Sequence, residues 1–454
     1  MAEIAPFRAL RYNPRFVPDL KLVVAPPYDV ISPEAQERYH ARHPHNVVRL
    51  ILSKEGEAGT PDHNRYTRAA RTFAAWQAER ILARDPVPGI YLSEQEFSLG
   101  QEHRFRRRGI MTLVRLAPYD EKIVFPHERT FAKYREDRLR LIRACPANLD
   151  PVFGFYPESE GPIRGIFDRL VETDPQVQLT DEDGIRHRMW ILREPDDVAV
   201  LVRTFRDKPI IIADGHHRYE TALNFRDEYR AREKAHTEGG PPCPHDFVLM
   251  YLVSAEDPGL IILPTHRVIR QGMAVPREAL RHLLETSFRT EAFPLDLGNP
   301  VMSLRIALAE VHRRGRDAAV FGLYAGGREV LVLELDGSSF GQDLVAAGYS
   351  PEFARLDVNI LHHVLIERTL GIKATELTDE RITYTRDEAA ALAVVASGEA
   401  QFALFQNAPS VEQVQAVALA GERMPQKSTY FYPKVLSGLV INPLDSPSII
   451  PAGH

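Results

Sequence analysis

The stretch of residues 210–223 constrains the fold of this chain more than any other. An apolar, β-branched run at 210–213 breaks at an Asp-Gly dipeptide and gives way at once to a helical pattern that begins with His-His-Arg. Apolar runs of this kind predict a buried strand, and Asp-Gly marks a turn. The sequence therefore predicts a strand, a tight corner and a helix in direct succession, with polar side chains gathered at the corner.

The chemistry of this corner suits an anion. Backbone N–H groups at the start of a helix lack partners, and the helix dipole adds partial positive charge, so a phosphate group is the expected guest. The residues that would form such a phosphate cradle are Gly215, His216, His217 and Arg218. Asp214, the last residue of the strand, would face the same guest, where it could bind a metal ion or accept a proton from a nucleophile.

Two plainer interpretations of the corner compete with this one. Asp214 could merely cap the helix while Arg218 and Glu220 lie in water, although an ordinary corner does not need two histidines and an arginine in one turn. A zinc site is disfavoured because adjacent residues on a helix point roughly 100° apart and the i,i+4 spacing of a helical zinc motif is absent.

The composition bounds the class of protein. The chain has 454 residues, of which 44% are hydrophobic, enough for two or three domains with cores of their own. It lacks a run of about 18 apolar residues and a signal-peptide pattern, so we expect a cytoplasmic protein with no membrane partner. The two cysteines, Cys145 and Cys243, lie far apart and have no partner motif, which fits a reducing compartment.

The charge balance argues against nucleic acid as a partner. A net charge of −6 leaves no overall basic footprint. One local basic stretch consists of Arg104, Arg106, Arg107 and Arg108. It fits the polar start of a strand, and its sign also suits an anionic ligand.

Strand and helix patterns alternate along the first half of the chain, which predicts mixed α and β structure. Ser-Pro-Glu at 32–34 has the residue types of a helix N-cap and first turn, so we expect a helix over residues 32–42. A Gly- and Pro-rich break follows at 238–244. The domains expected from these patterns are an N-terminal α/β domain (1–240), an inserted α/β lobe (241–375) and a C-terminal segment that completes the site (376–454).

Three further segments carry dense polar chemistry inside apolar surroundings. They are Val-Phe-Pro-His-Glu-Arg-Thr at 124–130, Pro-Thr-His-Arg at 264–267 and Met-Pro-Gln-Lys-Ser-Thr-Tyr-Phe-Tyr-Pro-Lys at 424–434. The first two follow apolar runs that we expect to be strands. Each segment alone also fits an ordinary surface turn, which is rich in such residues.

Together these segments resemble a known family. Asp-Gly-His-His-Arg at a strand-to-helix corner resembles the phosphate-binding box of the ParB/sulfiredoxin superfamily, and the free-serine kinases of that superfamily also carry Pro-His-Glu and, near the C-terminus, Pro-Lys-Thr-Thr. The counterparts here are 126–128, 214–218 and 425–429. The chain as a whole resembles a bacterial family recorded as a domain of unknown function, from Ala-Pro-Pro-Tyr-Asp-Val at 25–30 to the Lys-Ser-Thr-Tyr-Phe-Tyr-Pro-Lys segment at 427–434.

The resemblance implies an α+β fold with a mixed-sheet ParB/sulfiredoxin-like core, plus the inserted lobe. It implies a kinase that transfers a phosphoryl group from ATP or ADP, with Mg²⁺, to the hydroxyl of free L-serine, giving O-phosphoserine. Glu128 would be the general base and Asp214 a Mg²⁺ ligand or second base. The residues that would contact phosphate or substrate, beyond the corner, are His127, Arg129, Thr130, Lys427, Ser428, Thr429 and Tyr430.

Several features limit or compete with this interpretation. The kinases are much shorter than this chain, and an extra Gln426 leaves the register of the C-terminal box open by one residue. Sulfiredoxin chemistry would require a cysteine at position 216, where this chain has histidine. A ParB-type DNA clamp would require a basic helix-turn-helix module, and the sequence shows no basic recognition helix. The remaining alternative is a nucleotide-binding regulatory protein, in which the same cradle holds a nucleotide without phosphotransfer. Tyr28 and Asp29 are weaker candidates for the site, in a turn that the preceding prolines make rigid.

Overall fold

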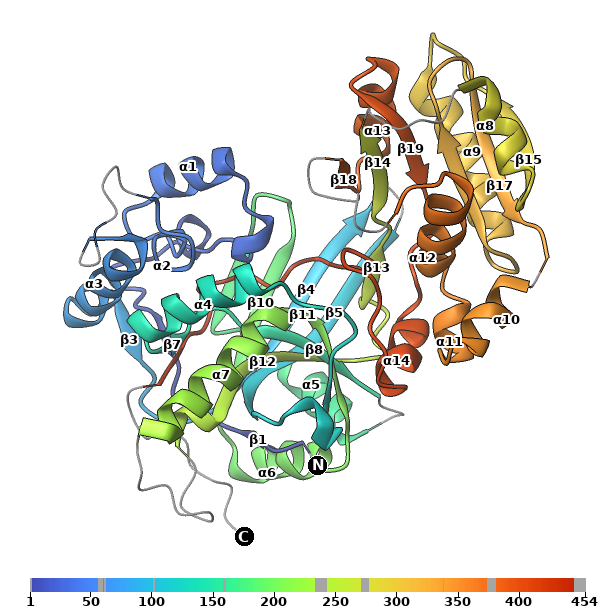
Figure 1. Ribbon diagram of the computed structural model, residues 1–454. Coiled ribbons are helices and arrows are strands. Elements are labelled where there is room, and N and C mark those ends of the chain that lie inside the picture. The colour runs from blue at the N-terminus through green and yellow to red at the C-terminus, as the bar shows by residue number, and fades with distance from the viewer. Residues whose placement is uncertain are drawn as a thin grey trace. The chain divides into compact units, whose positions relative to one another are not determined.

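The structure is a computed structural model that describes residues 2–55, 60, 63–100, 103–157, 161–232, 243–270, 277–337, 339–373 and 381–444 (Figure 1). The chain divides into two compact units. Unit 1 consists of residues 1–126, 130–261 and 433–454, and unit 2 consists of residues 127–129 and 262–432. Each unit is described by itself.

Unit 1 is built on a nine-stranded sheet with the strand order β6-β11-β8-β12-β5-β4-β10-β9, and β1 pairs with β5. Its strands are β1 (Ile4–Ala5), β4 (Ile90–Leu99), β5 (His103–Arg115), β6 (Val124–Phe125), β8 (Val152–Tyr156), β9 (Val177–Thr180), β10 (Arg186–Leu192), β11 (Ile210–Asp214) and β12 (Phe247–Ser254). Two short ladders join β2 (Leu10–Tyr12) to β3 (Leu82–Arg84) and β7 (Ala147–Asn148) to β21 (Asn442–Pro443).

The sheet of unit 1 is mixed. Strand β11 runs parallel to β6 and antiparallel to β8, and β12 runs parallel to β8 and antiparallel to β5. Because β6 and β11 are parallel neighbours, their carboxyl ends meet at one edge of the sheet. The predicted α+β class with a mixed sheet is confirmed.

The helices of unit 1 are α1 (Pro33–Arg42), α2 (Val48–Ile51), α3 (Arg65–Ala78), α4 (Ala132–Ala144), α5 (Pro162–Leu170), α6 (Pro195–Phe205) and α7 (His216–Arg232). The predicted helix at 32–42 is confirmed, and the Ser32 hydroxyl accepts the N–H of Ala35 as its cap. Helices α4 and α7 lie side by side in Figure 1. The helix predicted directly after the Asp-Gly corner is α7.

The main core of unit 1 lies between the sheet and the pair α5 and α6. It contains Trp190 and Phe205, which are fully buried, and Ile163 from the apolar face of α5. The first turns of α7 join the same core through Tyr219, whose hydroxyl donates to the carbonyl of Ala117. The corner at the start of α7 is therefore fixed to the centre of the unit.

Unit 2 contains a six-stranded antiparallel sheet with the order β15-β17-β16-β19-β14-β18. Its strands are β14 (His266–Arg270), β15 (Phe288–Pro294), β16 (Val320–Tyr324), β17 (Glu329–Leu335), β18 (Ile382–Thr385) and β19 (Ala400–Phe405). Strand β13 (Ile261–Leu263) lies at the chain boundary between the units, and β20 (Tyr430–Tyr432) ends unit 2.

Helices cover both faces of this second sheet, and each face has its own core cluster. The helices of unit 2 are α8 (Arg277–Leu284), α9 (Pro300–Arg314), α10 (Ser339–Ala346), α11 (Pro351–Ala354), α12 (Asp357–Ile360) with its π-helical continuation (Leu361–Thr369), α13 (Glu388–Ala396) and α14 (Val411–Leu419). Helix α8 and the π-helical segment contribute to one cluster, and α9 and α13 contribute to the other.

The domain boundaries expected from the sequence, at 240 and 375, fall within 233–242 and 374–380, outside the described residues. The three-domain division stays a prediction. Among the residues that the structure describes, no helix is long and apolar enough to cross a membrane.

The close packing of β5 against β12 gives a test of this fold. A Cβ added at Gly109 would lie 2.5 Å from the Tyr251 ring and 2.7 Å from the carbonyl oxygen of Leu252. We expect Gly109→Ala to lower the free energy of unfolding by about 1–3 kcal/mol, because the crowding involves backbone. The control is Gly165→Ala in α5, where the nearest atom lies 4.0 Å away. There, helix propensity predicts a gain of about 1 kcal/mol. Denaturant unfolding that ranks the two variants in the opposite order would contradict this packing of β5 against β12.

Candidate functional site

The corner between β11 and α7 depends on Gly215. This residue has a φ of 88°, in the left-handed region that favours glycine. A Cβ at this position would also lie 2.8 Å from the guanidinium group of Arg218. Glycine therefore permits both the turn of the backbone and the folding of Arg218 back across it.

Asp214 holds two cations at this corner. Its Oδ2 atom accepts a hydrogen bond from Nη2 of Arg218 at 3.0 Å, and its Oδ1 atom lies 3.3 Å from Nζ of Lys434. Arg218 also donates from Nη1 to the carbonyl oxygen of Pro151. All three charged side chains are largely buried, with exposures of 18% for Asp214, 10% for Arg218 and 11% for Lys434.

The protonation of Asp214 follows from these contacts. Burial alone would raise its pKa, but Lys434 and Arg218 outweigh burial and hold the pKa well below its ordinary range. Burial likewise lowers the pKa of Arg218, while Asp214 and Asp150 raise it above its ordinary value. Asp214 is therefore ionised at neutral pH and is a weak base, suited to anchoring cations rather than to accepting a proton.

The same contacts bear on a metal ion at Asp214. Each carboxylate oxygen already faces a cation, so a divalent ion bound there would lie against Lys434 and Arg218. Among the described residues, no cluster of three or more His, Cys, Asp or Glu side chains could hold a metal. The donor set at Asp214 in this arrangement does not fit a resident Mg²⁺ ion.

The turn at Tyr28 and Asp29 lies near the same corner. Both residues are close enough to Arg218 to contribute to its raised pKa. Backbone hydrogen bonds between Ala25 and Ser437 connect this N-terminal segment to the chain that follows Lys434. Segments from the two ends of unit 1 therefore meet at the β11–α7 corner.

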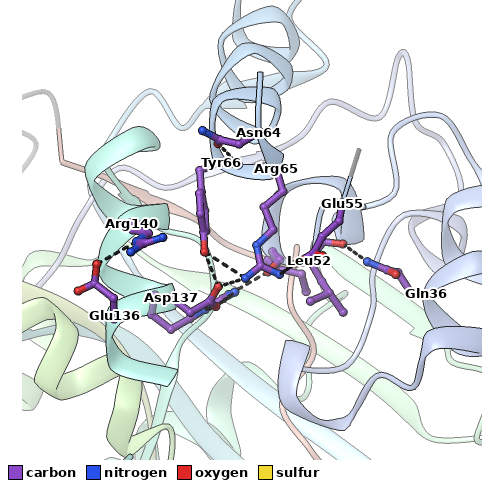
Figure 2. Close-up of polar contacts among 11 residues, drawn as sticks. Gln36, Leu52, Glu55, Asn64, Arg65, Tyr66, Glu136, Asp137 and Arg140 are labelled. Carbon is purple, nitrogen blue, oxygen red and sulfur yellow. Dashed lines mark hydrogen bonds and ion pairs between the residues drawn. The ribbon is translucent and has the colours of Figure 1, made fainter. Parts of the chain in front are cut away.

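A network of ion pairs between α3 and α4 contacts the turn that carries Tyr28. Figure 2 shows Asp137 of α4 accepting hydrogen bonds from Tyr66, at 2.7 Å, and from Arg65, both at the start of α3. Asp137 also accepts from Nε of Arg138 at 2.8 Å, and the guanidinium group of Arg138 lies 3.9 Å from the centre of the Tyr28 ring. Helices α3 and α4 thus fix the position of Tyr28.

The two histidines of the corner have different surroundings. His216 is buried and is close enough to Asp214 to help lower its pKa. The Nε2 atom of His217 accepts the backbone N–H of Phe131 at 3.0 Å, and its ring lies edge-on to Tyr134. His217 therefore holds the segment before α4 against α7, a contact that the sequence does not predict.

Thr130 also connects the segment before α4 to α7 within unit 1. Its hydroxyl donates to Oε2 of Glu220 in α7 at 2.5 Å, and Arg135 donates to the same oxygen at 2.9 Å. Glu220 is therefore not a solvated helix residue, as the plain interpretation of the corner would have it. It ties the end of the Pro-His-Glu-Arg-Thr segment to the first turns of α7.

In unit 2, the Pro-His-Glu segment lies beside the C-terminal Lys-Ser-Thr segment. The buried ring of His127 shares a hydrogen bond between Nε2 and the Thr429 hydroxyl at 2.8 Å. The backbone N–H of Met424 donates to the carbonyl oxygen of His127 at 2.7 Å, and Glu128 forms a parallel bridge with Met424. Gln426 donates to the carbonyl oxygen of Arg129 at 3.2 Å. Both sides of Glu128 are thereby held by backbone contacts.

The remaining predicted residues of unit 2 differ in exposure. Lys427 is exposed and has a φ of 56°, a left-handed conformation for a residue with a side chain. Ser428 is fully buried, and its hydroxyl donates to the carbonyl oxygen of Pro425. Tyr430 is half-buried, with the guanidinium group of Arg386 3.6 Å from its ring centre.

The predicted site residues thus form two groups. Those in unit 1 are Thr130, Asp214, Gly215, His216, His217 and Arg218, and those in unit 2 are His127, Glu128, Arg129, Lys427, Ser428, Thr429 and Tyr430. Sequence reasoning missed Lys434 and Asp150, which both act on the corner. The signal for Lys434 was present, since it is the second lysine of the segment that ends the family resemblance.

The ion pairs of Asp214 give a test by mutation. Asp214→Asn removes the one carboxylate that contacts both Arg218 and Lys434, so we expect the free energy of unfolding at pH 7 to fall by about 3 kcal/mol. The control Asp207→Asn, at an exposed residue of the turn before β11, should change it by no more than about 0.5 kcal/mol.

The difference in unfolding free energy between wild type and Asp214→Asn should decrease at low pH. Because folding lowers the pKa of Asp214, its stabilising effect is full above the unfolded value of about 3.9 and is lost as the pH falls towards the folded value. The gap between wild type and Asp214→Asn should therefore narrow below about pH 4. Urea titrations at pH 7 and pH 3 that give the same gap would contradict the ion-pair assignment.

Most of the chain matches one family of known sequences. Residues 4–359 match the family model described as "Protein of unknown function (DUF1015)". No curated protein matches the chain. Among solved structures, a free serine kinase in complex with AMP matches at 14% identity and a TM-score of 0.32, over 71% of this chain and 89% of its own.

Two other solved structures match to a similar degree. A conserved hypothetical protein from Pyrococcus furiosus matches at 13% identity and a TM-score of 0.31, over 71% of this chain and 93% of its own. C-terminally truncated SbnI from Staphylococcus aureus matches at 13% identity and a TM-score of 0.34, over 74% of this chain and 87% of its own.

Proposed function

The chain belongs to the DUF1015 family, and we propose that it is a nucleotide-dependent kinase that transfers a phosphoryl group from ATP or ADP to the hydroxyl of free L-serine, giving O-phosphoserine. The observation that carries this proposal is the β11–α7 corner, where a left-handed Gly215 opens a 17-residue helix beside two buried cations. The order of the Pro-His-Glu, Asp-Gly-His-His-Arg and Lys-Ser-Thr segments in the sequence also supports it.

The corner has the parts that a phosphate cradle needs. The first N–H groups of α7 carry partial positive charge, and Gly215 lets the backbone approach a ligand closely. Asp214 fixes Arg218 and Lys434 in place, so a phosphate group would meet cations that need little reorganisation. In this proposal Asp214 is a positioning residue. The proposal also includes a ParB/sulfiredoxin-like fold for the core that carries the corner.

Glu128 is the general base of the proposed reaction. It is half-buried, and contacts of the neighbouring residues His127 and Arg129 fix its backbone. In phosphoryl transfer a carboxylate of this kind accepts the proton of the attacking hydroxyl while the oxygen forms its bond to phosphorus. The low pKa of Asp214 makes that residue a poor alternative for the role.

The remaining residues of unit 2 serve the substrate in this proposal. Lys427 is exposed, and its backbone has a left-handed conformation that is strained for a residue with a side chain. Its ammonium group would bind a carboxylate or a phosphate. The Thr429 hydroxyl, oriented by His127, offers a further hydrogen bond. Arg129 and Tyr430, together with Thr130 of unit 1, complete the proposed substrate contacts.

Formation of the product tests the reaction itself. Purified protein is incubated with ATP or ADP and a panel of L-serine, L-threonine and L-homoserine, with and without added Mg²⁺, and products are identified by mass spectrometry. We expect O-phosphoserine from one of the two nucleotides. Nucleotide binding without any phosphorylated amino acid would favour the alternative, a nucleotide-binding regulatory protein, which needs the cradle but no base.

Replacing the base separates these two functions. Glu128→Gln keeps the shape of the side chain and removes its basicity, so we expect kcat to fall by roughly 10²–10⁴-fold with nucleotide affinity nearly unchanged. Glu136→Gln, at the exposed ion pair with Arg140 shown in Figure 2, is the control and should retain full activity. Near-normal turnover in Glu128→Gln would remove Glu128 from the mechanism.

Replacing the arginine of the cradle tests phosphate binding. Arg218→Ala removes a charged donor that Asp214 holds in place, so we expect the affinity for AMP to weaken by about 1.5–3 kcal/mol, or roughly 10- to 150-fold. The control is Arg143→Ala, an arginine of α4 with 40% exposure. Thermal unfolding of each variant confirms that it is folded before calorimetry. An unchanged AMP affinity in folded Arg218→Ala would mean that this arginine does not contact phosphate.

A further inference from the structure

Unit 1 contains a cavity that the proposed reaction does not use. Its volume is about 750 Å³, within the range of small-molecule sites. It is lined by the first half of β5, by the end of β8, by the start of α5 and by the residues that follow β12. All of its lining residues belong to unit 1.

The cavity lies at the other end of β8 from the β11–α7 corner. Strands β8 and β11 are antiparallel, and Phe153, near the start of β8, pairs with Asp214. Tyr156, the last residue of β8, lines the cavity, as does Ser254 at the end of the parallel neighbour β12. The cavity is therefore a site separate from the proposed phosphate cradle.

Arginines dominate the charged lining of the cavity. Arg104, Arg106 and Arg108 alternate along β5 and so point to one face of the sheet, and Arg164 comes from the first turn of α5. Arg108 is neutralised, because it donates to the buried Glu94 at 2.9 Å and to Asp168 at 2.8 Å.

The other three arginines, Arg104, Arg106 and Arg164, are less completely neutralised by neighbouring carboxylates. Arg106 is 52% exposed and lies 3.6 Å from Glu94, which is already paired with Arg108 and Arg188. Arg104 and Arg164 are exposed, and the described part of the chain provides no ion-pair partner for either side chain. The cavity thus presents two arginines without an ion-pair partner among the described residues, Arg104 and Arg164, and a third, Arg106, that shares Glu94 with Arg108 and Arg188.

The acidic lining residues cancel this charge only in part. Glu96 is paired with Arg186 outside the cavity lining, and Arg106 and Arg188 lie close enough to help lower its pKa. Asp257 accepts hydrogen bonds from the backbone N–H groups of Arg108 at 3.0 Å and Gly259 at 2.8 Å. Both of its carboxylate oxygens therefore stabilise the turn after β12. Glu256 is exposed and is the acid that would oppose an anionic ligand.

The rest of the lining is apolar and aromatic. Ile163, Tyr156 and Phe167 are buried side chains that border the cavity, and Phe105 lines it from β5, stacked on Phe97 with ring centres 5.7 Å apart. Aromatic and aliphatic surface of this kind favours a flat apolar group, and the arginines favour an anionic head.

We propose that this cavity binds a small organic anion in which a carboxylate or phosphate head is attached to a flat apolar body. Arg104, Arg106 and Arg164 hold the head, and the aromatic side chains pack against the body. The site goes beyond the proposed kinase reaction and does not depend on it, because none of its residues belongs to the cradle or to the Glu128 segment.

Calorimetric titration with two aromatic probes tests the site and distinguishes the two kinds of head. The probes are indole-3-acetate for a carboxylate and phenyl phosphate for a phosphate, with indole as the neutral comparison. We expect saturable binding of at least one anion and much weaker binding of indole. Binding of one anion alone assigns the head group, and saturable binding of neither overturns the proposal.

Exposed variants locate the binding. The double variant Arg106→Ala/Arg164→Ala should weaken the bound probe by at least about tenfold, whereas Arg203→Ala, an exposed arginine of α6, should leave it unchanged. Glu256→Gln should act in the opposite direction and tighten binding by about two- to fivefold, which loss of folding cannot imitate. Equal affinity in wild type and the double variant, or weaker binding in Glu256→Gln, would contradict the assignment to this cavity.

Discussion

The ionised carboxylate of Asp214 is the feature on which the proposed site depends. A buried arginine and a buried lysine near one another would repel and would each lose hydration, and a single carboxylate that contacts both offsets these costs. Asp214 comes from the end of β11, Arg218 from the first turn of α7 and Lys434 from the last part of the chain. One ion-pair cluster therefore fixes a strand, a helix and a C-terminal segment at a single corner.

Much of this corner could be predicted from the sequence because its signals are local. The β-branched run, the Asp-Gly turn and the helical pattern lie within fourteen consecutive residues, 210–223, and they fold as β11, a left-handed Gly215 and α7. The helix at 32–42 was predictable for the same reason, since Ser32 and Pro33 mark its start within one turn. The mixed α+β class follows from the alternation of such patterns.

The partners of the corner could not be predicted, because they depend on contacts between distant parts of the chain. The sequence singles out Lys427, but Lys427 is exposed and Lys434 is the lysine that faces Asp214. Both belong to one segment, and residue types alone do not show which of two lysines is buried. Asp150 precedes β8, and its proximity to Arg218 follows from the antiparallel pairing of β8 with β11. The hydrogen bond from the backbone N–H of Phe131 to His217 is another such distant contact, and the expected role of His217 at phosphate stays a prediction.

The central claim is that the cations on Asp214 form a phosphate site, and the contribution of one phosphate group tests it most directly. Calorimetry of AMP and of adenosine with wild type and with Lys434→Met gives that contribution as a ratio of affinities. The account predicts that wild type binds AMP at least about tenfold more tightly than adenosine and that Lys434→Met loses most of this preference while adenosine affinity is retained. Equal affinity for AMP and adenosine in wild type, or an unchanged ratio in folded Lys434→Met, would contradict it.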